Sequence, residues 1–142
     1  MAKLIIKRKS EWSNRLKAYK LFIDGKQVES IKNGEIKEFQ LEDGTHQVEA
    51  KVNWCSTGVF EFEVIDGKTK MYEVSLFKYG NIIGPLMGLL AVILIIGRRY
   101  AEANEIELGN MKYIAILVIP FFLYMIYYIT LGRKKYLRIK SI

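Results

Sequence analysis

Two long apolar runs dominate the second half of the chain. They extend over residues 79–97 and 113–131, and neither contains a charged residue. A bilayer core about 30 Å thick is crossed by roughly 20 apolar residues in a helix. The pattern therefore predicts a protein of the cell membrane with two spans. The helices at 79–97 and 113–131 would form a hairpin, joined by a connector at 98–112.

Residues 1–78 show a different pattern, in which apolar and polar residues alternate over short segments. Such alternation is typical of strands with one buried and one wet face, as in antiparallel sheets. Asx-Gly pairs such as Asp24-Gly25 and Asp43-Gly44, which favour tight hairpin turns, separate the segments. We therefore expect an all-β sandwich of about seven short antiparallel strands, at residues 3–9, 18–23, 27–31, 35–41, 45–54, 59–65 and 69–77.

The charge distribution favours one orientation of this hairpin. The net charge is +7, and much of the basic excess lies in a tail at 132–142 that contains no acid. Basic residues beside a spanning helix mark the cytoplasmic side and contact anionic headgroups. We therefore expect a cytoplasmic domain and tail, and membrane lipids rather than nucleic acid as partners. The predicted headgroup contacts are Arg133, Lys134, Lys135, Arg138 and Lys140.

Two further features agree with a cytoplasmic domain. The first twelve residues carry charges where a signal peptide would have its apolar segment. Cys55 is the single cysteine, so no intramolecular disulfide can form, which fits a reducing compartment.

A resemblance to a known family adds a prediction about the fold. The first matching hairpin is Ile23-Asp24-Gly25-Lys26 with Val28. The pattern continues with Leu41, Gly44, His46 and Val48, and both parts resemble the PEGA-type β-sandwich domain of bacterial surface and membrane proteins. The residues Ala50, Lys51, Trp54, Cys55 and Ser56 are similar to a motif in uncharacterised small bacterial membrane proteins. This resemblance implies a sandwich fold without an activity, and it implies a domain outside the cytoplasm, opposite to the charge pattern.

The residues that could carry chemistry in the domain are few. His46 and Cys55 are the only histidine and cysteine, and nine positions along one strand would keep them far apart. We expect His46 to brace the turn at Asp43-Gly44 and Cys55 to pack at a strand end. One His and one Cys cannot build a zinc site, and no phosphate-binding loop is present in the sequence. We therefore expect neither enzymatic activity nor a cofactor or metal.

Aromatic residues offer a possible recognition surface, formed by Trp12, Arg15 and Trp54. Tryptophan is frequent in binding hot spots. For Trp54 the favoured interpretation is different, because it continues the inward face of the strand that contains Val48 and Val52. Trp12 lies in the non-alternating stretch 10–17 and is the better candidate for an exposed aromatic side chain.

Three glycines recur every four residues at the start of the first apolar run: Gly80, Gly84 and Gly88. Small residues at this spacing let two helices approach closely. The stripe could pack on a second copy, on a larger membrane protein, or on the chain's own second helix. Neither apolar run holds an ionisable residue, which argues against a proton or ion pathway within one chain.

These observations predict a non-enzymatic, membrane-anchored β-domain that binds a protein or surface ligand, alone or as a homo-oligomer. Two alternatives stay open at this point. One is an oligomeric membrane-perturbing or channel-forming effector with a regulatory β-domain, and the other is an accessory subunit of a larger membrane complex.

Overall fold

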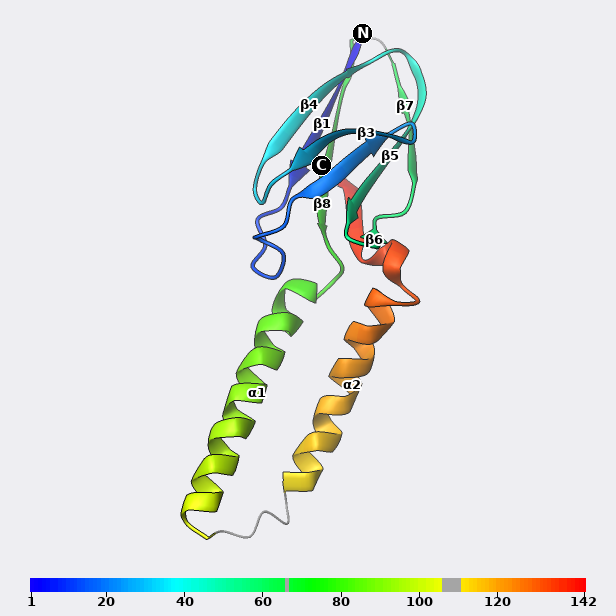
Figure 1. The fold of residues 1–142 in the computed structure, drawn as a ribbon. Coiled ribbons are helices and arrows are strands. Elements are labelled where there is room, and N and C mark those ends of the chain that lie inside the picture. The colour runs from blue at the N-terminus through cyan, green and yellow to red at the C-terminus, as the bar shows by residue number, and fades with distance from the viewer. Residues whose placement is uncertain (66, 106–110) are drawn as a thin grey trace.

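The computed structural model describes residues 1–65, 67–105 and 111–142, and shows a β-domain from which two helices project side by side (Figure 1). The domain contains eight strands before the helices and one after them. The strands are β1 (Ala2–Arg8), β2 (Tyr19–Ile23), β3 (Lys26–Ile31), β4 (Ile36–Leu41), β5 (Gly44–Val52), β6 (Cys55–Ser56), β7 (Phe60–Val64), β8 (Thr69–Leu76) and β9 (Leu137–Ser141). The helices are α1 (Gly80–Ala103), α2 (Met111–Ile129) and the short 3-10 helix η1 (Arg133–Lys135).

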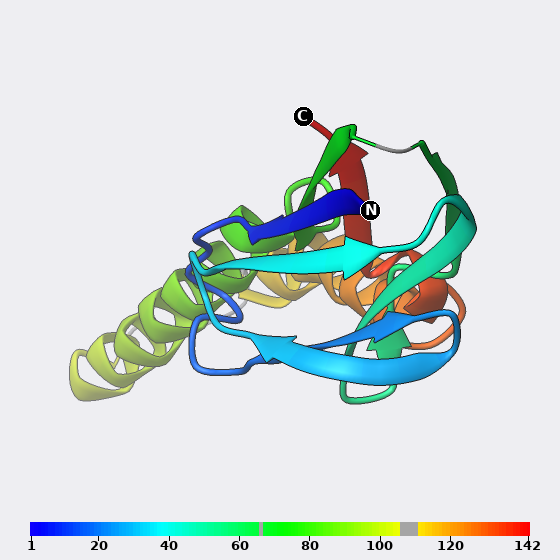
Figure 2. The ribbon, with the colours of Figure 1, turned by 90° about the horizontal axis from the view of Figure 1, so that it is seen from above.

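The strands form two sheets that face each other, as the view from above shows (Figure 2). The first sheet has the order β4-β1-β8-β9, and the second has the order β3-β2-β5-β6, with β7 also paired to β5. The seven predicted strands are all present, each with bounds within two residues of the prediction. The expected β-rich domain is therefore confirmed.

The prediction of a purely antiparallel arrangement was wrong, because β1 and β8 pair in parallel. A parallel pair needs a long connection between its strands. Here that connection is the whole segment from β2 to β7, which builds the second sheet and adds β4 to the first before the chain returns as β8.

One hydrophobic core fills the space between the two sheets. Inward residues of β1, β2, β5 and β8 are almost completely inaccessible to solvent, among them Leu4, Leu21, Val48 and Val74. Full burial of one such aliphatic side chain stabilises a fold by about 1.5–3 kcal/mol. Because residues from both sheets belong to the same cluster, the two sheets depend on each other for stability.

The end of the chain differs from the expected free basic tail. Leu137–Ser141 forms β9 and pairs antiparallel with β8 at the edge of the first sheet, with Leu76 opposite Leu137. Leu137 is buried in the core and Ile139 packs against it, whereas Arg138 and Lys140 remain exposed. The tail is thus partly a strand of the β-domain, because its alternating apolar residues complete the core.

The helices agree only in part with the predicted pair of spans. α1 continues six residues past the predicted end at Gly97, through Arg98 and Arg99. By length and composition, α1 is the one helix in the described residues that is long and apolar enough to cross a membrane, whereas the apolar segment Val118–Ile129 of α2 is shorter. Residues 106–110 of the predicted connector lie outside the described residues. Most apolar side chains described in both helices are exposed, among them Ile82, Ile95, Phe122 and Leu123.

Candidate functional site at the junction of the β-domain and the helices

Five aromatic side chains meet where the β-domain joins the helices, and we call them the junction cluster. Its centre is Phe77, which lies between β8 and α1 and is only 4% exposed. The Phe77 ring stacks on Tyr128 of α2 with 4.1 Å between centroids, and it also contacts Tyr124 and Tyr136 at 5.8 and 5.4 Å. Tyr127 completes the cluster by an edge contact with Tyr128. One phenylalanine thus contacts the end of α2 and the segment that leads into β9.

Hydrogen bonds fix the helix ends at this junction. The Tyr124 hydroxyl donates to the Lys78 carbonyl at 3.1 Å, which ties α2 to the segment before α1. The Trp54 indole N–H donates to the Ile129 carbonyl at 3.1 Å. The last carbonyls of a helix have no partner within the helix, so Trp54 supplies a donor that the end of α2 otherwise lacks.

The favoured interpretation of Trp54 as a core residue was wrong. Its side chain is 65% exposed, and it projects from the turn between β5 and β6 onto the end of α2. The strand ends at Val52, and Asn53 takes a positive φ of 53°, so the alternation does not continue to Trp54. Cys55 is buried instead, at the start of β6.

The loop between β1 and β2 holds the start of α1. The backbone N–H groups of Trp12 and Ser13 donate to the Asn81 side-chain oxygen at 2.6 and 3.2 Å. The Ser13 hydroxyl donates to the Gly80 carbonyl at 3.1 Å. Trp12 is exposed as expected, with the Arg15 guanidinium 3.9 Å from the centroid of its ring. Of the three predicted recognition residues, Trp12 and Arg15 therefore lie together at α1, and Trp54 lies at α2.

A buried arginine holds this loop in place. Arg8 is completely inaccessible to solvent, and its guanidinium lies 3.6 Å from the centroid of the Tyr19 ring. It donates to three backbone carbonyls, those of Asn14, Lys17 and Ile31, at 2.7, 2.5 and 3.2 Å. Two of these carbonyls belong to the loop. Buried charges require such hydrogen bonds to offset their lost hydration.

Glu11 connects the same loop to β8. Its carboxylate accepts the Leu76 backbone N–H at 2.8 Å and the Tyr19 hydroxyl at 3.4 Å. Burial raises the pKa of Glu11 above its ordinary value, although the Leu76 N–H, the Tyr19 hydroxyl and the nearby Arg8 charge act in the opposite direction. Glu11 thus fixes the position of the last residue of β8, three residues before the Tyr79–Gly80 step that opens α1.

The glycine stripe occupies three different environments. Gly80 lies against the Phe77 ring, so that an added Cβ would come within 2.8 Å of it. Gly84 lies near the Ser13 side chain, whose hydroxyl would be 3.2 Å from such a Cβ. Gly88 has open space around it, with nothing within 4 Å of the Cβ position. Gly80 therefore lets the junction cluster pack closely on α1, and Gly84 does the same for the β1–β2 loop. Gly88 leaves that part of the α1 surface uncovered.

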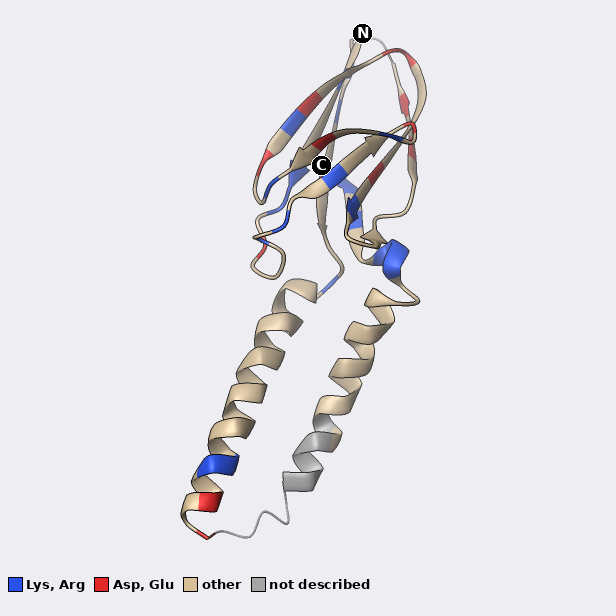
Figure 3. Ribbon diagram, in the orientation of Figure 1, with Lys and Arg blue, Asp and Glu red and all other residues tan. Residues whose placement is uncertain are grey.

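The predicted headgroup residues all lie at the junction or on the adjoining sheet. Arg133, Lys134 and Lys135 form η1, directly after α2. Arg138 and Lys140 project from β9. Charged residues cover the β-domain and the far end of α1 (Figure 3). In the sequence, the helical segments 80–97 and 113–129 contain no charged residue.

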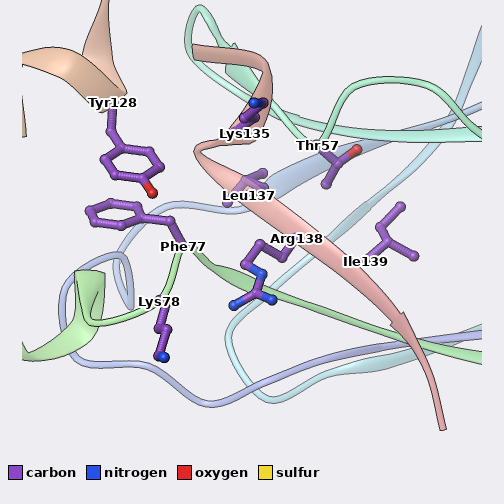
Figure 4. Close-up of a pocket in the computed structure, with 8 residues that line it drawn as sticks. All are labelled: Thr57, Phe77, Lys78, Tyr128, Lys135, Leu137, Arg138 and Ile139. Carbon is purple, nitrogen blue, oxygen red and sulfur yellow. The ribbon is translucent and has the colours of Figure 1, made fainter. Parts of the chain in front are cut away.

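Beside the junction cluster is a hollow of about 480 Å³, lined by Thr57, Phe77, Lys78, Tyr128, Lys135, Leu137, Arg138 and Ile139 (Figure 4). Its apolar residues include the stacked Phe77–Tyr128 pair, and its cations come from the β8–α1 segment, η1 and β9. A second hollow of about 310 Å³ adjoins it and shares Phe77, Lys78 and Arg138. Lys78 was not predicted as a site residue, because a hairpin places the segments before α1 and after α2 at one end without showing which side chains line a hollow there.

His46 and Cys55 are not brought together. His46 of β5 faces Phe62 across the strand pair, whereas Cys55 pairs with Val52, six residues farther along β5 and therefore about 20 Å away at strand spacing. Burial raises the pKa of the Cys55 thiol, which disfavours the nucleophilic thiolate.

Both ring nitrogens of His46 have acceptors. Nδ1 lies 2.7 Å from the Asp24 carboxylate and Nε2 lies 3.0 Å from the Glu42 carbonyl, so the doubly protonated ring is favoured. The hydrogen bond to Asp24 and then the one to Glu42 raise the pKa of His46. Because Glu42 precedes the turn at Asp43-Gly44, His46 braces that turn.

Comparison with known proteins identifies no relative. No protein-family model matches the chain, and neither a curated protein nor a solved structure matches it. The resemblance to PEGA-type domains therefore stays a prediction.

Proposed function

We propose that this chain is a non-enzymatic, membrane-anchored β-sandwich that binds a protein or surface ligand. In this proposal α1 and α2 cross the bilayer as a hairpin, and the junction cluster holds the domain at the membrane surface. The proposal also includes the cytoplasmic location of the domain, which the basic residues at the junction favour under the positive-inside rule.

The observation that carries the proposal is the pairing of β8 with β9. β8 leads into α1, and α2 leads back through η1 into β9, which pairs with β8. A single span would leave these two strands on opposite sides of the membrane. If α1 crosses the bilayer, α2 must therefore cross it in the other direction, even though its apolar segment is shorter in the described residues.

The flanks of the helices support the same arrangement. The uncharged part of α1, from Gly80 to Gly97, is about 27 Å long at the helical rise, close to the thickness of the hydrocarbon core. Exposed Trp12, Trp54 and Tyr79 lie at the domain end of the helices. Arg98 and Glu102, which form an ion pair at 2.9 Å, lie near the other end of α1. Aromatic and charged residues favour the two membrane–water interfaces.

A protein partner within the membrane is also part of the proposal. Gly88 leaves open space on α1, and a small residue at such a place lets a second helix approach closely. This surface could contact a second copy or a larger membrane protein. The partner would be detected by co-purification or by chemical cross-linking in membranes. Gly88→Leu should abolish this association, whereas the control Gly97→Leu, also in open space, should retain it.

Site-directed labelling tests the hairpin. In a Cys55→Ala background, single cysteines are placed by Lys68→Cys in the domain and by Asn104→Cys at the far end of α1. An impermeant maleimide should label the Asn104→Cys site in intact cells and the Lys68→Cys site only in inverted vesicles. Labelling of both sites from the same side would refute the spanning hairpin. The reverse pattern would preserve the hairpin but place the domain outside the cytoplasm.

A further inference from the structure

The hollow beside the junction cluster has the composition of an anion site. Of the eight residues that line it, three are cations and none is an acid. Lys78, Lys135 and Arg138 form no ion pair with a carboxylate among the residues that the structure describes. Its volume of about 480 Å³ lies within the range typical of small-molecule sites. Three cations that line one hollow, with no acid among its lining residues, favour binding of an anion from outside the chain.

The register of the first sheet extends this positive surface. Ser75 lies opposite Arg138 and Glu73 lies opposite Lys140, and these residues project outward because their neighbours Val74 and Leu76 are buried. Four cations and two acids line the second hollow. The cations are Lys9, Lys78, Arg138 and Lys140, and the acids are Glu11 and Glu73. Glu11 is occupied by the Leu76 N–H. Both acids line the second hollow, which shares Lys78 and Arg138 with the first, and no acid lines the first hollow.

The position of the hollow identifies the kind of anion. Phe77 lies three residues before the start of α1, and Tyr128 is the residue before the last of α2. Their stacked rings therefore lie level with both helix ends, and Lys78 and Arg138 extend to one side of this stack (Figure 4). If the helices cross the bilayer as proposed, this level is that of the lipid headgroups.

From this geometry we infer that the hollow lined by Lys78, Lys135 and Arg138 binds the phosphate-bearing headgroup of an anionic membrane lipid. Arg138 can form two parallel hydrogen bonds to phosphate oxygens, and the lysines contribute point charges. Among the apolar lining residues, the half-buried Tyr128 and Ile139 would contact the glycerol part of the lipid. This inference depends on the proposed spanning hairpin. It goes beyond a general attraction of basic residues to anionic lipids, because it assigns the headgroup to one defined hollow.

Binding of a short-chain lipid tests the pocket directly. The full chain in a neutral detergent is titrated with dioctanoyl phosphatidic acid, and bound lipid is counted by native mass spectrometry. The double variant Lys78→Gln/Arg138→Gln should bind about tenfold more weakly for each cation removed, as expected for loss of a charge-assisted hydrogen bond. The control Lys26→Gln/Lys68→Gln removes the same charge from exposed lysines outside the hollow and should keep the affinity of the unaltered chain.

Each other result would overturn the inference in a different way. Equal weakening in both double variants would show general attraction to net charge. Equal binding of dioctanoyl phosphatidylcholine would show that the anionic headgroup is not recognised. Inorganic phosphate that binds as tightly as the lipid would identify a site for soluble phosphate instead.

A separate measurement distinguishes failure of the pocket from failure of the hairpin. Membranes that contain the chain are extracted at alkaline pH, which releases peripheral proteins and retains those that span the bilayer. Release of the unaltered chain would refute the spanning hairpin and with it this inference. Retention of the chain and of both variants, combined with equal lipid binding by all three, would refute the pocket alone.

Discussion

Phe77 is the residue on which the connection between the β-domain and the helices most depends. Its ring is buried, stacks on Tyr128, and contacts Tyr124 and Tyr136. Replacement by alanine would remove all of these contacts while leaving the backbone N–H of residue 77, which donates to the Tyr136 carbonyl at 2.9 Å, in place. The Phe77→Ala variant therefore isolates the contribution of the ring.

The expected loss is large. Truncation of a buried phenylalanine to alanine costs about 3–5 kcal/mol, part of which is the aromatic pair energy of about 0.5–1.5 kcal/mol for each well-placed pair. Collapse of the cavity would reduce this cost, but Gly80 has no side chain that could move into the space. Because a typical domain is stable by about 5–15 kcal/mol, we expect the variant to lose a substantial part of its free energy of unfolding.

The measurement uses the full chain in neutral detergent micelles, unfolded with guanidinium chloride and followed by circular dichroism and tryptophan fluorescence. The matched control is Phe22→Ala, because Phe22 projects from β2 with its ring 4.6 Å from the Lys51 ammonium and is only half-buried. Phe22→Ala should cost about 1 kcal/mol, a typical value for a point substitution. With Trp12→Phe in the background of both variants, the native fluorescence reports Trp54 alone. It should change in Phe77→Ala and not in Phe22→Ala, because the Trp54 indole is bonded to the end of α2.

Equal losses in the two variants would refute the argument. They would show that the contacts of Phe77 contribute no more than those of an outward-facing ring. An unchanged native fluorescence, combined with a loss of about 3–5 kcal/mol in the free energy of unfolding, would refute only the expectation that Phe77 positions α2. In that case Phe77 would stabilise the β-domain without fixing the position of α2.

Three further predictions concern other parts of the domain. Arg8→Met should lower the free energy of unfolding by about 3–5 kcal/mol, because it leaves three backbone carbonyls without their donor. A denaturant titration in which the free energy of unfolding falls by less than about 1 kcal/mol would contradict this. The hydrogen bond to Asp24 raises the pKa of His46 above its ordinary value of 6.5. The protonated ring therefore stabilises the folded domain fully below pH 6.5, and this stabilisation is lost as pH rises through the folded pKa. The melting temperature should fall over that range and should not do so in His46→Gln; an equal fall in both proteins would contradict this. Trp54→Phe should cost about 1 kcal/mol for one neutral hydrogen bond. The Trp12 indole N–H makes no such bond to the residues that the structure describes, so Trp12→Phe should be nearly neutral in the same unfolding assay.

The strands could be predicted from the sequence because local signals determine them. Alternation assigned the faces of β5 and β8, and Asp24-Gly25 marked the hairpin between β2 and β3. Both residues of that pair have positive φ, of 50° and 77°, as a two-residue hairpin turn requires. Where the local signal was misleading, a single residue was responsible. Asn53 has a positive φ and turns Trp54 outward, although the alternation alone would place Trp54 in the core.

Features that depend on distant segments could not be read in this way. β9 is a five-residue strand that contains Arg138 and Lys140 and directly follows the basic residues of η1 and Tyr136, so it is predicted as a basic tail unless the free edge of β8 is known. Arg8 stands at an inward position of β1, but its three acceptors lie 6, 9 and 23 residues away. Pairing of β1 with β8 joins residues more than 60 positions apart. Each of these is a tertiary contact with no periodic signature.

The two connections between the β-domain and the helices are both very short, and this has a mechanical consequence. Only residues 77–79 separate β8 from α1, and residues 130–132 separate α2 from η1. Phe77 stacks on Tyr128 across these connections, and Trp54 and Asn81 bind the helix ends to the domain. The domain therefore cannot rotate as a tethered body, and the outer face of the first sheet keeps a fixed orientation to the two helices. A ligand in the hollow would contact Phe77 and Lys78 of the first connection and Tyr128 near the end of α2. Its binding energy would therefore act on the relative position of the two helices.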